Sequence, residues 1–113
     1  MQLYTFRSEA GNKISKYHSI LASYSKVLRT EEPTNIGFIH IEKGGVVGYH
    51  QAPVPQLFIV VNGEGWGEGE DEQRVYLKSG DGVFWNKGEG HRSGSEKGLT
   101  ALVLQSEELQ APS

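Results

Sequence analysis

Two histidines and a glutamine are the residues of this chain whose types and spacing could do chemistry. His50 ends a glycine-rich run that begins at Gly44, and His91 ends a second such run that begins at Gly80. Gln56 is a polar residue at the start of an otherwise apolar segment. Neutral imidazoles bind Zn, Fe, Mn, Ni and Cu, whereas an amide oxygen is a weaker neutral donor. Because the chain has no cysteine, a metal would need His, carboxylate or amide ligands.

The three residues each lie in a segment that reads as a β-strand. Side chains alternate between the two faces of a strand, so residues two apart point the same way. On this basis Gln56 shares a face with Phe58, and His91 shares a face with Ser93. If these faces and that of His50 line one cavity, the three polar side chains converge in it.

The spacing of residues 44–63 resembles the first motif of the cupin superfamily. That motif reads Gly, five residues, His, one residue, His, three or four residues, Glu, six residues, Gly. Gly44, His50 and Gly63 stand at the matching intervals. Ala52 takes the place of the second histidine, and Gln56 takes the place of the glutamate.

Residues 80–95 resemble the second cupin motif. It reads Gly, five residues, Pro, one residue, Gly, two residues, His, three residues, Asn. Gly80, Gly88 and His91 match, whereas Asn86 replaces the proline and Ser95 replaces the asparagine. Two of the four residues that hold the metal in cupins have therefore changed.

The resemblance implies an all-β fold, a cupin-type antiparallel β-barrel (double-stranded β-helix or jelly roll), as a single domain over residues 1–113. It also implies that His50, Gln56 and His91 meet in the barrel and bind a divalent metal (Zn, Fe, Mn, Ni or Cu), with water or an anionic ligand completing the shell. The alternative is that both histidines line a small-molecule pocket without an ion. Phe58, Trp66 and Ser93 are the further residues expected in the pocket.

Short strands separated by turn residues are expected along the whole chain. Asn62-Gly63 predicts a tight hairpin. Residues 14–29 fit a helical period as well as an alternating one, and we favour a strand over 20–29. Residues 107–113 are expected to form a disordered tail. The predicted strands are 2–6, 20–29, 35–42, 46–51, 56–61, 64–70, 74–78, 83–85, 91–95 and 99–105.

Three other residues could belong to a site or to the core. Trp66 lies between two glycines, which permit close approach, so we expect it in the pocket. Trp85 shares a face with Val83 and is expected in the core. His40 either faces the cavity beside Phe38 or lies at a subunit interface. The acidic run 68–72 is expected at a solvated hairpin tip.

Composition excludes some partners and favours others. The chain has 113 residues, 15 glycines and a net charge of −3 without a basic stripe, so we expect no nucleic-acid partner. No apolar run approaches the length of a membrane span, and no signal peptide is evident, so a cytoplasmic protein is expected. The N-terminal strand of one subunit could cover the exposed edges of another, which favours a homodimer.

Functions from different classes remain open, because one barrel hosts many chemistries. The lost ligand positions favour a small-molecule binding protein, with or without a metal. The retained histidine pair supports an enzyme, either a metal-dependent dioxygenase or a sugar-type isomerase, using His50, Gln56 and His91. A structural dimer module with a vestigial pocket is the third reading.

Overall fold

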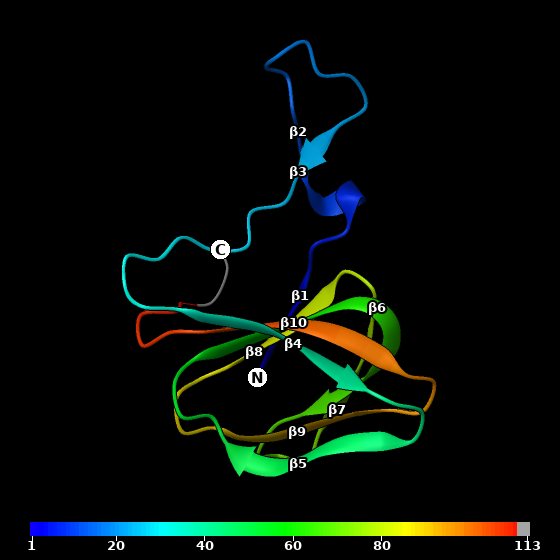
Figure 1. Ribbon diagram of the computed structural model, residues 1–113, viewed down its shortest axis with the longest axis vertical. Coiled ribbons are helices and arrows are strands. Elements are labelled where there is room, and N and C mark those ends of the chain that lie inside the picture. The colour runs from blue at the N-terminus through cyan, green and yellow to red at the C-terminus, as the bar shows by residue number, and fades with distance from the viewer. Residues whose placement is uncertain (111–113) are drawn as a thin grey trace.

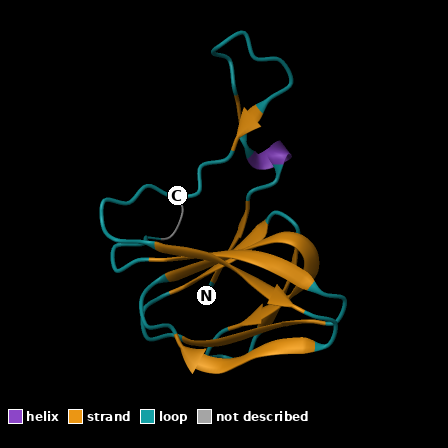
Figure 2. Ribbon diagram, viewed as in Figure 1, coloured by secondary structure: helices purple, strands orange, loops and turns teal. Residues whose placement is uncertain are grey.

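Antiparallel strands wound into a barrel make up most of the computed structural model, which describes residues 1–110 (Figures 1 and 2). The predicted all-β fold is confirmed. The 3₁₀ turn η1 (Ser8–Ala10) is the one helical element of these residues, and no helix among them is long and apolar enough to cross a membrane. The strands are β1 (Gln2–Thr5), β2 (Asn12–Lys13), β3 (Ser23–Tyr24), β4 (Asn35–Ile41), β5 (Gly45–Gln51), β6 (Gln56–Glu68), β7 (Arg74–Lys78), β8 (Asp81–Trp85), β9 (Gly90–Ser95) and β10 (Leu99–Gln105).

The barrel has two layers that share strand β6. The first layer has the strand order β1-β8-β6-β10-β4, and the second consists of β5, β9, the far half of β6 and β7. In Figure 1 the first layer lies above the second, with β6 curving from one to the other. The long strand β6 thereby joins the two layers along one side.

The hairpin predicted at Asn62-Gly63 is wrong, because β6 runs unbroken through both residues. The strand bends there instead, and its register against β10 shifts between Thr100 and Ala101. Gly63 has a φ of +81°, and a Cβ at this position would overlap the backbone of Gly98. Glycine is therefore required by a β-bulge rather than by a turn.

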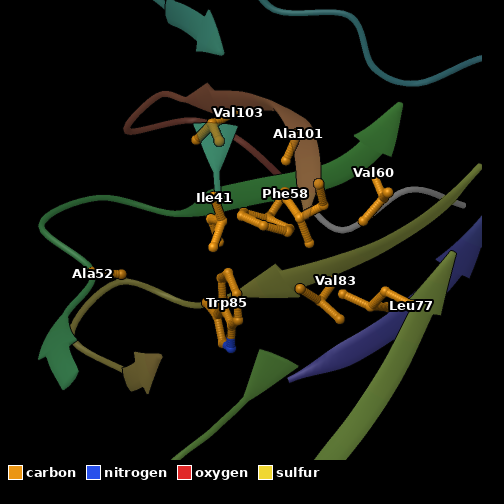
Figure 3. Close-up of a cluster of buried hydrophobic side chains, with 10 residues drawn as sticks. Ile41, Ala52, Phe58, Val60, Leu77, Val83, Trp85, Ala101 and Val103 are labelled. Carbon is orange, nitrogen blue, oxygen red and sulfur yellow. The ribbon is translucent and has the colours of Figure 1, made fainter. Parts of the chain in front are cut away.

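The space between the layers is filled by apolar side chains from both of them (Figure 3). Trp85 and Phe58 are the largest fully buried side chains, and Ala52 packs in the same cluster. Trp85 is thus in the core, as expected. The buried members of the cluster are Ile41, Ala52, Phe58, Val60, Leu77, Val83, Trp85, Leu99, Ala101 and Val103.

A second apolar cluster lies on the opposite side of the first layer, which we call the outer face. Its buried members are Leu57, Ile59, Phe84, Leu104 and Leu109. Leu109 is buried in this cluster, whereas Glu107, Glu108 and Gln110 are exposed, and the disordered tail expected at 107–113 stays a prediction. Residues 111–113 lie outside the described part of the chain.

Residues 11–25 form a narrow projection, here called the arm, that stands clear of the barrel (Figure 1). The strand expected over 20–29 is reduced to β3, which pairs only with β2, and no helix forms. Tyr17, His18 and Leu21 have φ between 53° and 61°. Helices and strands both need negative φ, so neither can continue through the arm.

Candidate functional site

His50 and His91 lie directly opposite each other on the paired strands β5 and β9. Their ring centroids are 4.4 Å apart, and the ring planes are tilted by 56°. The structure therefore brings together two imidazoles that are 41 positions apart in the sequence. This pair is the centre of the candidate site.

A β-bulge in β5 turns His50 toward His91. Val47 packs against the interior core, and three steps along β5 from Val47 to His50 match only two steps along β9. The extra residue allows Val47 and His50 to share the interior side although an odd number of positions separates them. Tyr49 lies on the other side, over Gly90, where a Cβ would overlap its ring.

Backbone carbonyls hold both imidazoles in one tautomer. His50 Nδ1 donates to the carbonyl oxygen of Gly48 at 2.8 Å, and His91 Nδ1 donates to that of Glu89 at 3.1 Å. A carbonyl oxygen can only accept, so the proton of each neutral ring is on Nδ1 and the lone pair is on Nε2. Metal-binding histidines are commonly oriented in this way.

His91 is the buried member of the pair, with 3% of its surface exposed, whereas His50 is exposed. The His91 ring stacks on the indole of Trp85, with centroids 4.2 Å apart. Burial lowers the pKa of His91, opposed by the hydrogen bond to Glu89 and assisted by the nearby His50. His91 is therefore neutral near pH 7, the form that binds a metal.

Three further predicted residues lie on the interior side of their strands. Gln56 is buried and directly opposite Trp85 on the neighbouring strand β8. Phe58 packs edge-on against the same indole, with centroids 5.8 Å apart. Ser93 is buried two residues after His91. Gln56 is thus one strand away from the indole that supports His91.

Trp66 does not lie in the barrel interior beside the histidine pair, where it was expected, but lines a separate pocket with Glu64 and Tyr76. It lies opposite the exposed Tyr76, and the guanidinium of Arg74 covers its ring at 3.7 Å. The next residue, Gly67, faces the interior instead, since a Cβ there would touch Trp85.

The bulge in β6 explains the error for Trp66. Two steps along β6, from Val60 to Asn62, match one step along β10. The extra residue exchanges the two faces of the strand beyond it. Even-numbered residues such as Phe58 point inward before the bulge, and even-numbered residues such as Trp66 point outward after it.

His40 also faces away from the interior, which corrects the alternative that placed it in the cavity. Its ring is exposed on the outer face, 6.3 Å from that of Phe38, and Nδ1 is 3.0 Å from Thr100 Oγ1. The subunit-interface alternative is compatible with this position and stays a prediction.

Sequence reasoning missed the role of Glu68, which was assigned to a solvated acidic tip. Its carboxylate is buried and accepts hydrogen bonds from Arg74 Nε and Arg92 Nε, each at 2.7 Å. Hydrogen bonds from Arg92 and Arg74 lower the pKa of Glu68. The two guanidinium groups that Glu68 pairs with lie over the ring of Trp66, at 3.7 Å for Arg74 and 5.4 Å for Arg92. Glu68, Arg74 and Arg92 lie on three different strands, β6, β7 and β9. Their proximity can therefore be recognised in the sequence only once the strand pairing is known.

The donor set at the histidine pair fits a cation that accepts nitrogen ligands. Among residues 1–110, no cluster of three or more His, Cys, Asp or Glu side chains is placed to hold a metal. The donors available at the pair are the Nε2 atoms of His50 and His91, and the buried amide of Gln56 stays the predicted third. Such a site leaves several coordination positions to water or a ligand.

Comparisons with known proteins find likeness in structure and none in sequence. No protein-family model matches the chain, and no curated protein matches it. A cupin-like protein from Thermotoga maritima is similar over 66% of this chain, with a TM-score of 0.62 and 23% identity. The matched part of the chain spans 58% of that protein's length.

Two further solved structures extend the likeness. An RmlC-like cupin family protein with a double-stranded β-helix fold, from Methanocaldococcus jannaschii, has a TM-score of 0.61 and 20% identity, covering 70% of this chain and 73% of its own. A predicted oxalate decarboxylase from Thermotoga maritima has a TM-score of 0.56 and 24% identity. The match covers 61% of this chain and 62% of that protein. At such identities the likeness is one of fold.

Proposed function

We propose that this chain, which has the cupin fold, binds a divalent metal through Nε2 of His50 and His91 and offers the open coordination positions to a small molecule. The observation that carries the proposal is the facing pair of imidazoles, each with its Nδ1 proton donated to a backbone carbonyl. Both lone pairs are available without rearrangement of either ring's hydrogen bond. Ligands that are oriented in advance lose less entropy on binding.

The surroundings of the pair support a small anionic ligand. Trp85 and the rest of the core fill the interior side of His91, so access is from the exposed side, where His50 lies. Two neutral imidazoles, with or without the amide of Gln56, leave the charge of the cation uncompensated. A carboxylate or another anionic oxygen donor would supply the missing negative charge.

Metal titration of protein purified without a histidine tag tests the proposal. We expect one Zn²⁺ or Co²⁺ per chain by calorimetry and metal analysis, and a ligand-field absorption band with Co²⁺. His50→Ala and His91→Ala should each lose this binding. His18→Ala is the matched control, because His18 is exposed on the arm, away from the pair. Equal metal content in wild type and both site variants would end the proposal.

Catalysis at the same site is the second candidate function, as a metal-dependent dioxygenase or a sugar-type isomerase. The open positions beside the two histidines are the feature that supports it, because a reaction at a metal needs room for substrate. Oxygen uptake by iron-loaded protein, measured across phenolic and thiol compounds, separates the two functions. Uptake that disappears in His91→Ala indicates an oxygenase. Metal binding without uptake, and without interconversion of sugars, indicates a binding protein.

A further inference from the structure

The arm exposes large apolar side chains that the rest of residues 1–110 does not cover. Leu21 is 99% exposed and Tyr17 is 87% exposed, and Ile20 and Tyr24 are exposed as well. Figure 1 shows the arm extending away from the barrel, which accounts for the exposure of these side chains. Isolated apolar residues on a surface are ordinary, but a projecting hairpin tip made of them is typical of a binding element.

The outer face of the first layer has a matching uncovered region on its β4 side. Ile36 and Phe38 are each 62% exposed there, and Val61 is exposed on β6, with β10 between it and β4. Ile36 and Phe38 lie opposite Leu104 and Leu102 of β10, so they continue the apolar surface of the outer face.

The chain itself covers the other half of the same face. Phe6, Val27 and Leu28, from the two stems that lead into and out of the arm, pack against the buried outer cluster. The face is therefore suited to being covered by segments next to the arm, and only its β4 side lacks such a cover. β4 also ends the sheet order as an edge strand.

The chain exposes more surface than a compact monomer of its mass does, which supports a partner that covers part of it. The chain exposes 7394 Å², whereas a compact monomer of 12.5 kDa exposes about 6200 Å². The excess, roughly 1200 Å², exceeds the 800 Å² or so that each partner contributes to a standard interface. Its radius of gyration is 14.7 Å, against about 13.3 Å for a globular domain of this length.

Charge favours a second copy of this chain as that partner. Residues 6–29, which contain the arm and its stems, carry five basic and one acidic residue, a net charge of +4. The remaining residues carry six basic and thirteen acidic residues, a net charge of −7. Within that segment the arm itself holds Lys13 and Lys16 and no acidic residue, so it is attracted to the acidic barrel of another copy.

We propose that two copies of this chain exchange arms, with Tyr17, Ile20 and Leu21 of each arm lying on Ile36, Phe38 and Val61 of the other copy. A two-fold axis makes both contacts at once, because each chain contributes one arm and one face. The closed arrangement covers both apolar regions and leaves neither free for a third copy. This dimer is independent of the metal site.

Light scattering after size-exclusion chromatography tests the assembly. We expect the wild type at micromolar concentration to have twice the 12.5 kDa mass of the chain. Leu21→Asp and Phe38→Asp should each raise the dimer dissociation constant at least about tenfold. Tyr76→Asp is the matched control, since Tyr76 is as exposed but lies on β7, in the other layer. A monomeric wild type, or a dimer unaffected by both variants, would overturn the proposal.

Disulfide trapping tests the exchange itself, and the absence of native cysteine makes it specific. Equal amounts of Leu21→Cys and Phe38→Cys protein are mixed and oxidised. We expect a mixed disulfide dimer to form faster than in a mixture of Leu21→Cys with Tyr76→Cys. Equal rates in the two mixtures would show that the arm does not lie on this face, even if a dimer forms. Circular dichroism of each variant confirms that the barrel is folded.

Discussion

The imidazole of His91 lies nearly parallel to the indole of Trp85, with ring centroids 4.2 Å apart and planes at 24°. On the core side, Trp85 is fully buried and packs edge-on against Phe58. His91 is thereby anchored to the hydrophobic core, whereas His50, 4.4 Å from it, is exposed. Of the two proposed metal-binding residues, His91 is thus held rigidly in its neutral form, whereas His50 is in contact with solvent.

Burial of His91 predicts a pH dependence of stability. Its pKa is lowered in the folded chain, whereas an unfolded histidine titrates near 6.5. Between these two values the unfolded state binds more protons, so the free energy of unfolding falls as the pH drops below about 6.5 and is unaffected above it. Thermal melts should show a Tm that falls as the pH is lowered from about 6.5 to about 5. The slope should be smaller in His91→Gln and unchanged in His18→Gln. An equal slope in His91→Gln would contradict the prediction.

Glu68 should contribute stability at neutral pH that is lost in acid. Hydrogen bonds from Arg92 and Arg74 lower its pKa below the ordinary value of 4.5. A carboxylate with a lowered pKa stabilises the fold above the unfolded pKa, and this contribution disappears as the pH falls through the folded pKa. We expect Glu68→Gln to lower Tm near pH 7, with the difference from wild type shrinking below about pH 4. Glu42→Gln, at an exposed site, should match wild type throughout. A difference that persists undiminished in acid would argue against an ionic role.

We predict that residue 94 must be glycine, because the indole of Trp66 leaves no room for a larger side chain there. A Cβ on Gly94 would overlap the six-membered ring of that indole, and Arg74 prevents the ring from lifting away. Overpacking of this kind costs about 1–3 kcal/mol, so Gly94→Ala should lower the free energy of unfolding by that amount in urea titrations. Gly37→Ala is the control, because a Cβ there meets nothing within 4 Å, and it should change stability by less than about 0.5 kcal/mol. Equal effects of the two substitutions would remove the steric explanation.

The sequence allowed prediction of individual strands from local signals, whereas the barrel and the histidine pair were predicted from the resemblance of residues 44–63 and 80–95 to the two cupin motifs. Alternating apolar residues located strands such as β4, β7 and β10 within a residue or two. These patterns reflect side-chain alternation and turn geometry, which neighbouring residues determine.

The errors arise where a distant strand decides the outcome. Asn62-Gly63 has the local signature of a hairpin, yet pairing with β10 and β9 keeps β6 extended through it. The resulting bulge reverses the side on which Trp66 lies, and no pattern within β6 shows that reversal. The arm was ambiguous for a related reason: its apolar residues have no partner on the same chain, so nothing local selects helix or strand.

Gln56→Glu tests whether the amide position belongs to the metal site. Gln56 stands where the first cupin motif has a glutamate, and it is buried opposite Trp85. A carboxylate there would supply the negative oxygen ligand that the pair lacks. Substitution of even an outer-shell partner changes metal affinity roughly 10–100-fold, so the gain for Zn²⁺ or Co²⁺ should be at least about tenfold by calorimetry.

The same substitution should destabilise the metal-free protein, because a buried carboxylate without a cation is costly. Tm should therefore fall without metal and rise on metal addition by more than in wild type. Gln51→Glu is the matched control: it makes the same charge change beside His50, at an exposed position of β5. Equal gains in affinity for the two variants would indicate a general electrostatic effect, and no gain in Gln56→Glu would place the amide outside the ligand set. A gain confined to Gln56→Glu would show that this barrel retains the geometry of a three-ligand site and lacks only its charge.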